Sequence, residues 1–521
     1  MKQKIKNILS FIIILIAIIA TIGSIYYHKL YPSQDFDEIV FYLFNGAEHT
    51  STNVVNHVIS SCILPVTLLT LILFIPAIRT DKKKILKVTT KNKEYDFQAF
   101  PIKFISNHRK IYLTIILIIA TVVTIINFKI DKYITYKMQQ TKIYENYYVN
   151  AKDVEITFPE TKRNLIIIIG ESMENTLMSR QNGGDWNYSV IPELEALAST
   201  SINFSNTEKI GGMQQVNGAG FTAAGIISMH SGVPLAVGGF VQNANVYRGN
   251  GKYLGGVYTL GDILREEGYN LEAMMGSYAK FGGRYEYFTT HGQYKIFDYE
   301  YVLNQNLMTE QDSKWWGFED DKLFEWSKQE ILNLSKEDKP FNYIMLTADT
   351  HFPDGYLSEN VENKFDSQYE NVYAYSSKKI YEFVKWIQKQ EFYENTTIVV
   401  IGDHLGMQEN FYNTQEGYTR TVYNAIINSA IEEANSKNRT FTTMDMFPTI
   451  LASIGAEIDG ERLGLGTNLF SGVPTLAETI GIKELDTELK KNSSFYNKNI
   501  LGDDYFTMKE NERKGDSWFY E

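Results

Sequence analysis

The sequence predicts an α/β protein in which N-terminal transmembrane helices precede an α/β/α sandwich with a mostly parallel sheet. Two observations lead to this fold class. Three apolar runs of membrane-spanning length lie within the first 130 residues. After them, short continuous apolar runs alternate with helical patterns. This alternation is typical of a parallel sheet covered by helices on both faces.

The three apolar runs cover residues 8–27, 58–78 and 111–128. Each is close to the roughly 20 residues that a helix needs to cross the hydrocarbon core of a bilayer. The first run follows three lysines, as a signal peptide does, but its apolar part is long and no small-residue cleavage site follows it. We therefore expect all three runs to be retained as transmembrane helices.

The charges around these runs predict their orientation. The loop between the second and third runs, residues 79–110, is rich in lysine and arginine, whereas the loop between the first and second runs is acidic. By the positive-inside rule the N-terminus and the basic loop lie in the cytoplasm. Three crossings then place everything after about residue 130 outside the cytoplasm.

Charge argues against nucleic-acid binding, and cysteine content excludes disulfides and cysteine-based metal sites. Residues 1–150 carry 18 Lys+Arg and 9 Asp+Glu, whereas the rest of the chain carries 32 and 53. An acidic main domain is unsuited to binding nucleic acid, so we expect no nucleic-acid partner. Cys62 is the single cysteine. The chain therefore has no intrachain disulfide and no cysteine-based metal cluster.

Short apolar runs predict the strands of the sheet. Runs such as NLIIII and TTIVVI are almost entirely apolar or β-branched, which is the pattern of a strand buried on both faces of a parallel sheet. The expected strands cover residues 164–169, 271–275, 341–347 and 396–401.

The helices are predicted from helical periodicity and from residues that start or stop helices. Gly268 ends a short helix over 260–267, because glycine readily adopts the left-handed conformation found after helix ends. The pattern over 369–390 is amphipathic, as expected for a helix that covers a sheet. The remaining expected helices cover 192–199, 320–333 and 445–455, and a further helix begins near Thr222.

These elements divide the chain into four parts. We expect a membrane domain over residues 1–130, a connector over 131–160, an extracytoplasmic catalytic domain over 161–480 and a C-terminal tail over 481–521. The connector is polar and rich in tyrosine, which suits a segment near a membrane surface. The tail carries no pattern that predicts a structure or a role.

Polar side chains follow three of the predicted strands. Glu171 comes after the first, His351 after the third, and Asp403 and His404 after the fourth. Ligands of open α/β sheets bind beyond the carboxyl ends of the strands, so these side chains are expected to lie together. Carboxylate oxygens and imidazole nitrogens suit a divalent metal ion. Any one of them alone would be an ordinary loop residue.

The glycine-rich stretch 211–235 contains a threonine, Thr222, behind the small residues of GAGF. Small residues allow the backbone to turn sharply and to approach a ligand closely. Thr222 lies at or near the N-cap of the helix that follows, where the helix dipole favours an anion such as phosphate. The alternative is an ordinary helix cap with no further role.

The motifs IIIIGES, GFTAAGIISMHSGVPL, TADTHFP and VVIGDHLGM resemble the sulfatase-like branch of the alkaline phosphatase superfamily. More narrowly, the chain resembles the phosphoglycerol transferases and lipoteichoic acid synthases, and most of all the osmoregulated periplasmic glucan phosphoglycerol transferases. The similarity covers most of residues 30–475. It implies the fold of that superfamily.

The resemblance also implies roles for individual residues. It implies one divalent metal ion, with Mn2+ expected and Zn2+ or Mg2+ as alternatives. Thr222 is expected to be the nucleophile as well as a ligand, and His351 to contact the phosphoryl group or the leaving oxygen. The implied metal ligands are Glu171, Thr222, Asp403 and His404.

Three further residues are expected to bind substrate. Arg284 lies where the lipoteichoic acid synthases have an arginine that binds phosphoglycerol, although their Phe-Trp-Asn-Arg motif reads Phe-Gly-Gly-Arg here. The alternative for Arg284 is a surface arginine. Gln214 and Asn217, just before Thr222, either hold the head group or make loop hydrogen bonds. Trp315 and Trp316 either stack on a sugar or pack in the core.

The implied function is transfer of phosphoglycerol from phosphatidylglycerol to a periplasmic or cell-surface glycan, through a phosphothreonine intermediate. The implied location is the bacterial inner (cytoplasmic) membrane, with several spans. One alternative is a phosphoethanolamine transferase acting on lipid A or a surface glycan. A sulfatase would need a cysteine or serine, convertible to formylglycine, in place of Thr222. An alternative from another class is a catalytically inactive membrane-anchored scaffold or sensor.

Overall fold

The computed structural model describes residues 2–32, 34–45, 52–78, 85–90, 93–98, 100–236, 253–432 and 435–502. The chain divides into two compact units. The first contains residues 1–36 and 52–134, and the second contains residues 37–51 and 135–521. The second unit is therefore discontinuous in sequence, because it includes a short segment from between the first two apolar runs.

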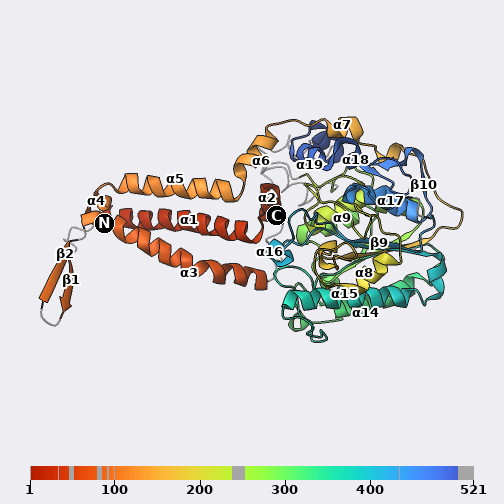
Figure 1. Ribbon diagram of the computed structural model, residues 1–521, viewed down its shortest axis with the longest axis horizontal. Coiled ribbons are helices and arrows are strands. Elements are labelled where there is room, and N and C mark those ends of the chain that lie inside the picture. Colours follow the sequence, from red (N-terminus) through yellow and green to blue (C-terminus); the bar gives the residue numbers. More distant parts are fainter. Residues whose placement is uncertain are drawn as a thin grey trace. The chain divides into compact units, whose positions relative to one another are not determined.

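Three long helices lie side by side in the first unit (Figure 1): α1 (Lys2–Leu30), α3 (Thr52–Ala77) and α5 (Arg109–Asn127). Each is long and apolar enough to cross a membrane. The first contains the predicted span 8–27, and the other two end one residue before the predicted spans 58–78 and 111–128 do. A few residues between them are buried, whereas many apolar side chains face outward. Outward apolar side chains suit a helix surrounded by lipid. The unit also contains β1 (Ile85–Thr90), β2 (Lys93–Gln98) and α4 (Phe100–Asn107).

The second unit is built on a six-stranded sheet with the strand order β6-β5-β7-β4-β8-β9. The first five of these strands are parallel to one another, and β9 pairs with β8 in the antiparallel direction. The strands are β4 (Asn164–Gly170), β5 (Asn270–Met275), β6 (Lys295–Phe297), β7 (Phe341–Leu346), β8 (Thr396–Gly402) and β9 (Asn424–Ile427).

All four predicted strands are present, so the prediction of a mostly parallel sheet is confirmed. The two strands that the sequence did not predict, β6 and β9, lie at the edges of the sheet and have three and four residues. Such short strands contain too few positions to show a periodic pattern.

Helices cover both faces of the sheet, as expected for an α/β/α sandwich (Figure 1). Ile166 and Ile168 of β4 pack in one apolar core with α8 (Pro192–Ser199), α14 (Asp320–Leu334) and α15 (Gln368–Ile387). Successive strand residues point to opposite faces, so Leu165 and Ile167 point toward the other layer. That layer contains α9 (Thr222–Ser231), α11 (Leu260–Glu266) and α17 (Met446–Ser453).

Shorter elements complete the second unit. Among the described residues, the remaining α-helices are α2 (Phe36–Asn45), α6 (Ile130–Lys137), α7 (Ile143–Tyr147), α12 (Arg284–Thr290), α13 (Tyr299–Asn304), α16 (Glu409–Tyr412), α18 (Leu476–Ile480) and α19 (Ile482–Lys490). Most of α2 belongs to this unit, and α6 is divided between the two units. The remaining strands are β3 (Ile156–Thr157), β10 (Glu457–Ile458), β11 (Arg462–Leu463) and β12 (Gly466–Thr467).

The region expected to be a tail is folded in its described part. The hydroxyl of Tyr496 donates to the carbonyl oxygen of Pro234 at 3.0 Å and accepts from the backbone N–H of Ala236 at 3.1 Å. Leu485 and Leu489 of α19 are buried. Residues 482–502 therefore support the segment that follows α9. Residues 503–521 lie outside the described part.

Candidate active site and metal centre

The carboxyl ends of β4 and β8 bring three potential metal ligands together. Glu171 follows β4, whereas Asp403 and His404 follow β8. The pairing of Gly170 with Gly402 puts the two strand ends at the same level. One ligand atom from each side chain lies within 4.8 Å of the other two, and all three residues are buried. Within the described ranges, this is the one group of His, Cys, Asp and Glu side chains arranged to hold a metal ion.

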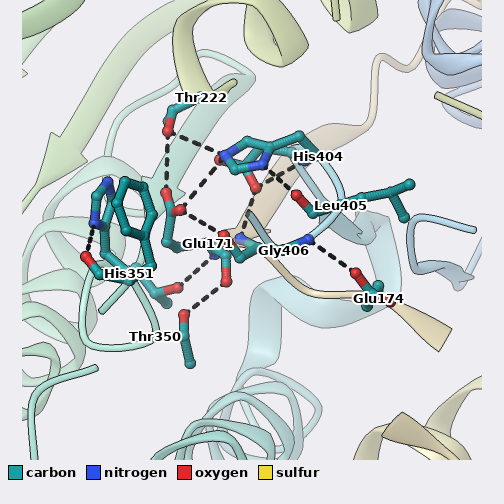
Figure 2. A network of polar contacts seen from close by, with 12 residues as sticks. Glu171, Glu174, Thr222, Thr350, His351, His404, Leu405 and Gly406 are labelled. Carbon is teal, nitrogen blue, oxygen red and sulfur yellow. Dashed lines mark hydrogen bonds and ion pairs between the residues drawn. The ribbon is translucent and has the colours of Figure 1, made fainter. Parts of the chain in front are cut away.

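Thr222 faces the same cluster from the first turn of α9 (Figure 2). Its hydroxyl donates to Oε2 of Glu171 at 3.1 Å and lies 3.5 Å from Nε2 of His404. The N-cap position itself belongs to Phe221, and no side chain caps this helix. The Thr222 hydroxyl is therefore directed to the cluster and not to its own backbone. The helix N-terminus favours an anion at this place.

Close backbone packing brings α9 to the end of β8. A Cβ atom on Gly225 would lie 2.2 Å from the carbonyl oxygen of Asp403. A Cβ atom on Gly402 would lie 2.1 Å from the carbonyl oxygen of Met173. Any side chain at either glycine would push these segments apart. The sequence analysis explained the glycines before Thr222, and it included Gly225 in a family motif without a physical reason for it.

Buried charges dominate the cluster. Burial opposes ionisation of Glu171, but hydrogen bonding to His404 and nearby histidine charge outweigh burial and lower the Glu171 pKa. Burial opposes a charge on His404 as well, but the charge of Asp403 and the contact with Glu171 outweigh it and raise the His404 pKa to about 10. Buried carboxylates need a positive partner. A proton on His404 is one such partner, and a bound cation is another.

The donor set fits a divalent metal ion. Oδ2 of Asp403 is buried without a hydrogen-bond partner among the described residues, whereas Oδ1 accepts from the backbone N–H of Ser172 at 2.8 Å. Nδ1 of His404 contacts the carbonyl oxygen of Leu405 at 2.8 Å, which leaves Nε2 for a metal. Carboxylate oxygens, a hydroxyl and an imidazole nitrogen suit Mn2+, Mg2+ or Zn2+.

His351 lies after β7, beside the cluster (Figure 2). Its Nδ1 contacts a backbone carbonyl oxygen at 2.7 Å. Burial lowers the pKa of His351, and the nearby charge of Arg284 adds to this effect. The imidazole is therefore neutral near pH 7. A neutral imidazole next to the cluster is suited to accept a proton from a reacting group or, once protonated, to return it.

Arg284 lies in a pocket that also includes Thr222 and His351. It is 5% exposed, so it is not a surface arginine. Its Nη2 donates to Oγ of Ser277 at 3.0 Å, and its Nε donates to the carbonyl oxygen of Phe281 at 3.0 Å. These bonds hold the guanidinium in the pocket wall. The structure thus brings Arg284 together with the predicted nucleophile.

The aromatic part of this pocket comes from Phe281 and Trp316, whose ring centroids are 5.1 Å apart. Gly282 and Gly283 have φ values of 68° and 75°, a conformation that is unfavourable for tryptophan. Trp316, which is far from these glycines in the chain, lines the pocket instead. Phe318 lies in the core. The sequence left stacking and core packing open for the tryptophans.

Gln214 and Asn217 do not line this pocket. The backbone N–H of Gln214 donates to the carbonyl oxygen of Phe441 at 2.8 Å, and that of Asn217 donates to Asp486 at 2.8 Å. Their role in substrate binding stays a prediction. The neighbouring Gln215 is closer to the cluster, because its Oε1 accepts from the backbone N–H of Leu405 at 2.8 Å.

A buried ion pair supports the loop after β8, and the sequence did not reveal it. Glu174 accepts from the backbone N–H of Gly406 at 2.8 Å (Figure 2). Arg420 pairs with Glu174 and donates to the carbonyl oxygen of Gly406 at 2.7 Å. The N–H and the carbonyl oxygen of Gly406, two residues after His404, are thus both held by hydrogen bonds. No local pattern links Glu174 to Arg420, since 246 positions separate them.

Comparison with known proteins extends this description. A sequence model of the sulfatase family matches residues 163–456. Phosphoglycerol transferase I of Escherichia coli (strain 55989 / EAEC) is 29% identical over 342 residues, which are 64% of this chain. The match spans 42% of the relative's own length. Phosphoglycerol transferase I of Shigella boydii serotype 18 matches to the same extent.

Two solved structures have a similar fold. The lipoteichoic acid synthase LtaP from Listeria monocytogenes has a TM-score of 0.47 and 18% identity, and the match covers 62% of this chain and 82% of that one. The lipooligosaccharide phosphoethanolamine transferase A (EptA) from Neisseria meningitidis has a TM-score of 0.49 and 14% identity. That match covers 87% of this chain and 84% of that one.

Proposed function

This chain belongs to the sulfatase family, and from that premise we propose that it is a membrane-anchored transferase. It moves phosphoglycerol from phosphatidylglycerol to a hydroxyl of a periplasmic or cell-surface glycan. The observation that carries the proposal is the Thr222 hydroxyl, 3.1 Å from Glu171 and 3.5 Å from His404. A threonine here suits phosphoryl transfer, because sulfatases use a cysteine or serine converted to formylglycine. The name of the E. coli relative supports the same reaction.

The reaction proceeds in two displacements at phosphorus. The Thr222 oxygen attacks the lipid phosphorus, a new P–O bond forms, and the bond from phosphorus to the diacylglycerol oxygen breaks. Thr222 loses its proton, and diacylglycerol leaves with one. The acceptor hydroxyl then attacks the phosphothreonine and loses its proton, and the Thr222 oxygen regains one. The products are diacylglycerol and the phosphoglycerol-bearing glycan.

His351 moves the protons in this scheme. Its neutral imidazole lies in the same pocket as Thr222. In the protonated form it gives a proton to the departing diacylglycerol oxygen, and in the neutral form it takes one from the acceptor hydroxyl. Arg284 binds the phosphoryl oxygens, because a buried guanidinium is a strong hydrogen-bond donor to phosphate.

Glu171, Thr222, Asp403 and His404 hold one divalent metal ion in this proposal. When bound, such an ion lowers the pKa of a coordinated hydroxyl and offsets negative charge on the phosphoryl oxygens. We propose Mn2+, since a ligand set rich in oxygen suits it better than Zn2+. Metal analysis of the purified full chain tests this assignment.

The head group is glycerol in this proposal because of the charges in the pocket. Arg284 is buried in the pocket wall, and Glu171, the one acidic residue among the described lining residues, is directed to the metal cluster. The ammonium of ethanolamine would be repelled by the guanidinium and would find no carboxylate free for it. Phosphoethanolamine transfer is the second candidate, since the metal chemistry is the same.

The proposed setting is a bacterial inner membrane, with the catalytic unit in the periplasm or outside. Support comes from three helices long and apolar enough to span a bilayer, together with the basic loop 79–110. A reporter that is active only outside the cytoplasm, fused after residue 150, should be active. The same reporter fused within the basic loop should be silent. The opposite pair of results would contradict this topology.

The function is tested with the full chain in vesicles containing labelled phosphatidylglycerol or labelled phosphatidylethanolamine. We expect mass spectrometry to find a phosphoglycerol adduct on the peptide that contains Thr222. Thr222→Ala should abolish the adduct, and Thr222→Ser should retain part of it. A phosphoethanolamine adduct would favour the second candidate. No adduct from either lipid, with turnover that survives Thr222→Ala, would sink the covalent mechanism.

A further inference from the structure

One helix outside the sheet packs next to the candidate active site. Most of α2, from Asp37 onward, belongs to the unit that contains the sheet, although its sequence lies between the first two apolar helices. Val40 and Phe41 of this helix are fully buried. Asp37 forms an ion pair with Lys137 at 3.3 Å. The described part of α2 is therefore packed into the unit by both apolar and ionic contacts.

Phe41 contacts two segments that converge on the pocket. Its ring centroid lies 4.5 Å from that of Phe221, the residue just before Thr222. A Cβ atom on Gly282, two positions before Arg284, would lie 4.0 Å from the Phe41 ring. One side chain thus packs against the segment of the nucleophile and lies next to the segment of the pocket arginine.

Glu38 adds a second contact on the same side of α2. A Cβ atom on Gly220 would lie 3.0 Å from Oε1 of Glu38, so the helix approaches the loop before Thr222 closely. Positions 38 and 41 are three residues apart and therefore share one face of a helix. That face follows the loop over two consecutive residues, Gly220 and Phe221.

The two segments next to Phe41 are not held by the sheet. Phe221 ends a glycine-rich loop, and Gly282 lies in a turn with left-handed backbone conformation. Loops without a hydrogen-bond ladder open and shift more easily than strands. The two segments also lie close to each other, because a Cβ atom on Gly282 would lie 3.5 Å from Cβ of Ala223. Phe41 adds a contact from outside that helps to keep Thr222 and Arg284 at a constant separation. Displacement of a reacting group by about 1 Å can reduce a rate about 100-fold.

We propose that α2 is a positioning element of the active site and that Phe41 is its positioning residue. Phe41 holds the segment of Thr222 against the segment of Arg284, so that both side chains meet the same donor phosphate. This inference rests on the proposed function, in which Thr222 and Arg284 act on one substrate. It follows that the catalytic unit requires the loop between the first two apolar helices as well as the chain after the third.

The test uses the full chain in vesicles and compares Phe41→Ala with Phe41→Leu and Ile39→Ala. Ile39 is a half-buried residue of the same helix and serves as the matched control. We expect Phe41→Ala to slow phosphatidylglycerol turnover at least 10-fold, Phe41→Leu to restore most of it, and Ile39→Ala to change it less than 2-fold. Hydrolysis of bis-p-nitrophenyl phosphate, a small diester that also presents phosphoryl oxygens, should fall in Phe41→Ala as well, whereas the metal content should stay unchanged.

A double-mutant cycle separates positioning from a general loss of structure. If Phe41 acts through Arg284, Phe41→Ala should cost at least 5-fold less in an Arg284→Ala background than in the wild-type background. Equal costs in both backgrounds would overturn the inference, as would loss of the bound metal in Phe41→Ala. If the wild-type protein forms no adduct on Thr222, the proposed function fails instead, and that result is visible before any α2 variant is made.

Discussion

The cluster of Glu171, Asp403 and His404 adjoins the pocket around Arg284 at Thr222, but the two are built in different ways. The cluster takes Glu171, Asp403 and His404 from the ends of two adjacent parallel strands, where pairing sets their positions. The pocket takes Arg284 from the start of α12 and Trp316 from a loop, and further support comes from α2. In the proposed function, the reaction type therefore depends on the ends of paired strands, and the choice of donor depends on segments outside the sheet.

This comparison predicts that the largest losses follow changes to the cluster and affect every donor equally. Asp403→Asn should remove the bound metal and lower turnover of both lipid and small diester by about 10³-fold or more. The exposed Asp459→Asn is the control and should behave as wild type. Elemental analysis and rates measure the two effects. Full activity of Asp403→Asn without bound metal would contradict the proposed role of Asp403 as a metal ligand.

The next effect concerns how the cluster is packed. Gly225→Ala places a methyl group 2.2 Å from the carbonyl oxygen of Asp403, so α9 and the end of β8 must separate. We expect a loss of about 2–4 kcal/mol in the free energy of unfolding of the second unit, within the range of overpacked cores. Metal affinity should fall with it. Thermal unfolding in the presence and absence of Mn2+ measures both, and an unchanged midpoint would contradict the close packing.

Changes in the pocket should affect substrate binding and not the metal. Arg284→Ala should raise KM for phosphatidylglycerol about 10- to 100-fold, because a charge-assisted contact to phosphate is lost, and it should leave the metal content unchanged. The exposed Arg265→Ala is the matched control. Kinetics and elemental analysis of the two variants measure these effects. Loss of the bound metal in Arg284→Ala would show that Arg284 supports the cluster instead.

The pH dependence joins the two regions. Because burial and the charge of Arg284 lower the His351 pKa below 6.5, the imidazole is neutral above that lowered value. The second displacement needs the neutral imidazole, so kcat/KM for the acceptor should fall as pH drops below the lowered pKa. In Arg284→Ala one lowering charge is absent, so this acid limb should move to higher pH. Profiles of kcat/KM for the acceptor against pH measure the shift, and a limb that moves the other way would refute it.

The smallest predicted effect separates two neighbouring glutamines. Gln215→Ala removes an acceptor for the backbone N–H of Leu405, next to His404, and should lower turnover about 3- to 10-fold, as expected for one hydrogen bond. Among the described residues the Gln214 side chain makes no hydrogen bond to the cluster, so Gln214→Ala should change turnover less than 2-fold. Parallel assays of the two variants decide between them. A larger effect at Gln214 would support the sequence-based expectation that it binds substrate.

The sequence predicted the fold class because its signals are local. A buried parallel strand is a short apolar run, and the residue that follows it is at the ligand-binding edge by the geometry of such sheets. Glu171, Asp403 and His404 were found in this way, and the structure brings them within 4.8 Å of one another. The three spans were likewise evident as continuous apolar runs.

Other features depend on contacts between distant segments, which leave no local pattern. Trp316 was ambiguous in the sequence, because stacking and core packing use the same residue type. Gly225 is explained by the carbonyl oxygen of Asp403, and Glu174 by Arg420, in each case far away in the chain. The described part of the expected tail is folded for the same reason, since its partners lie near residue 235.

The sequence by itself determined the strands, the spans, the order of the ligand residues and the resemblance to a family, because each is written in consecutive residues. Only the tertiary structure decided that Thr222 meets Glu171 and that Arg284 is buried in the same pocket as Thr222. It also decided that Phe41 of α2 packs against Phe221 and lies next to Gly282. These relations depend on how separate elements pack, and packing is a property of the folded chain as a whole.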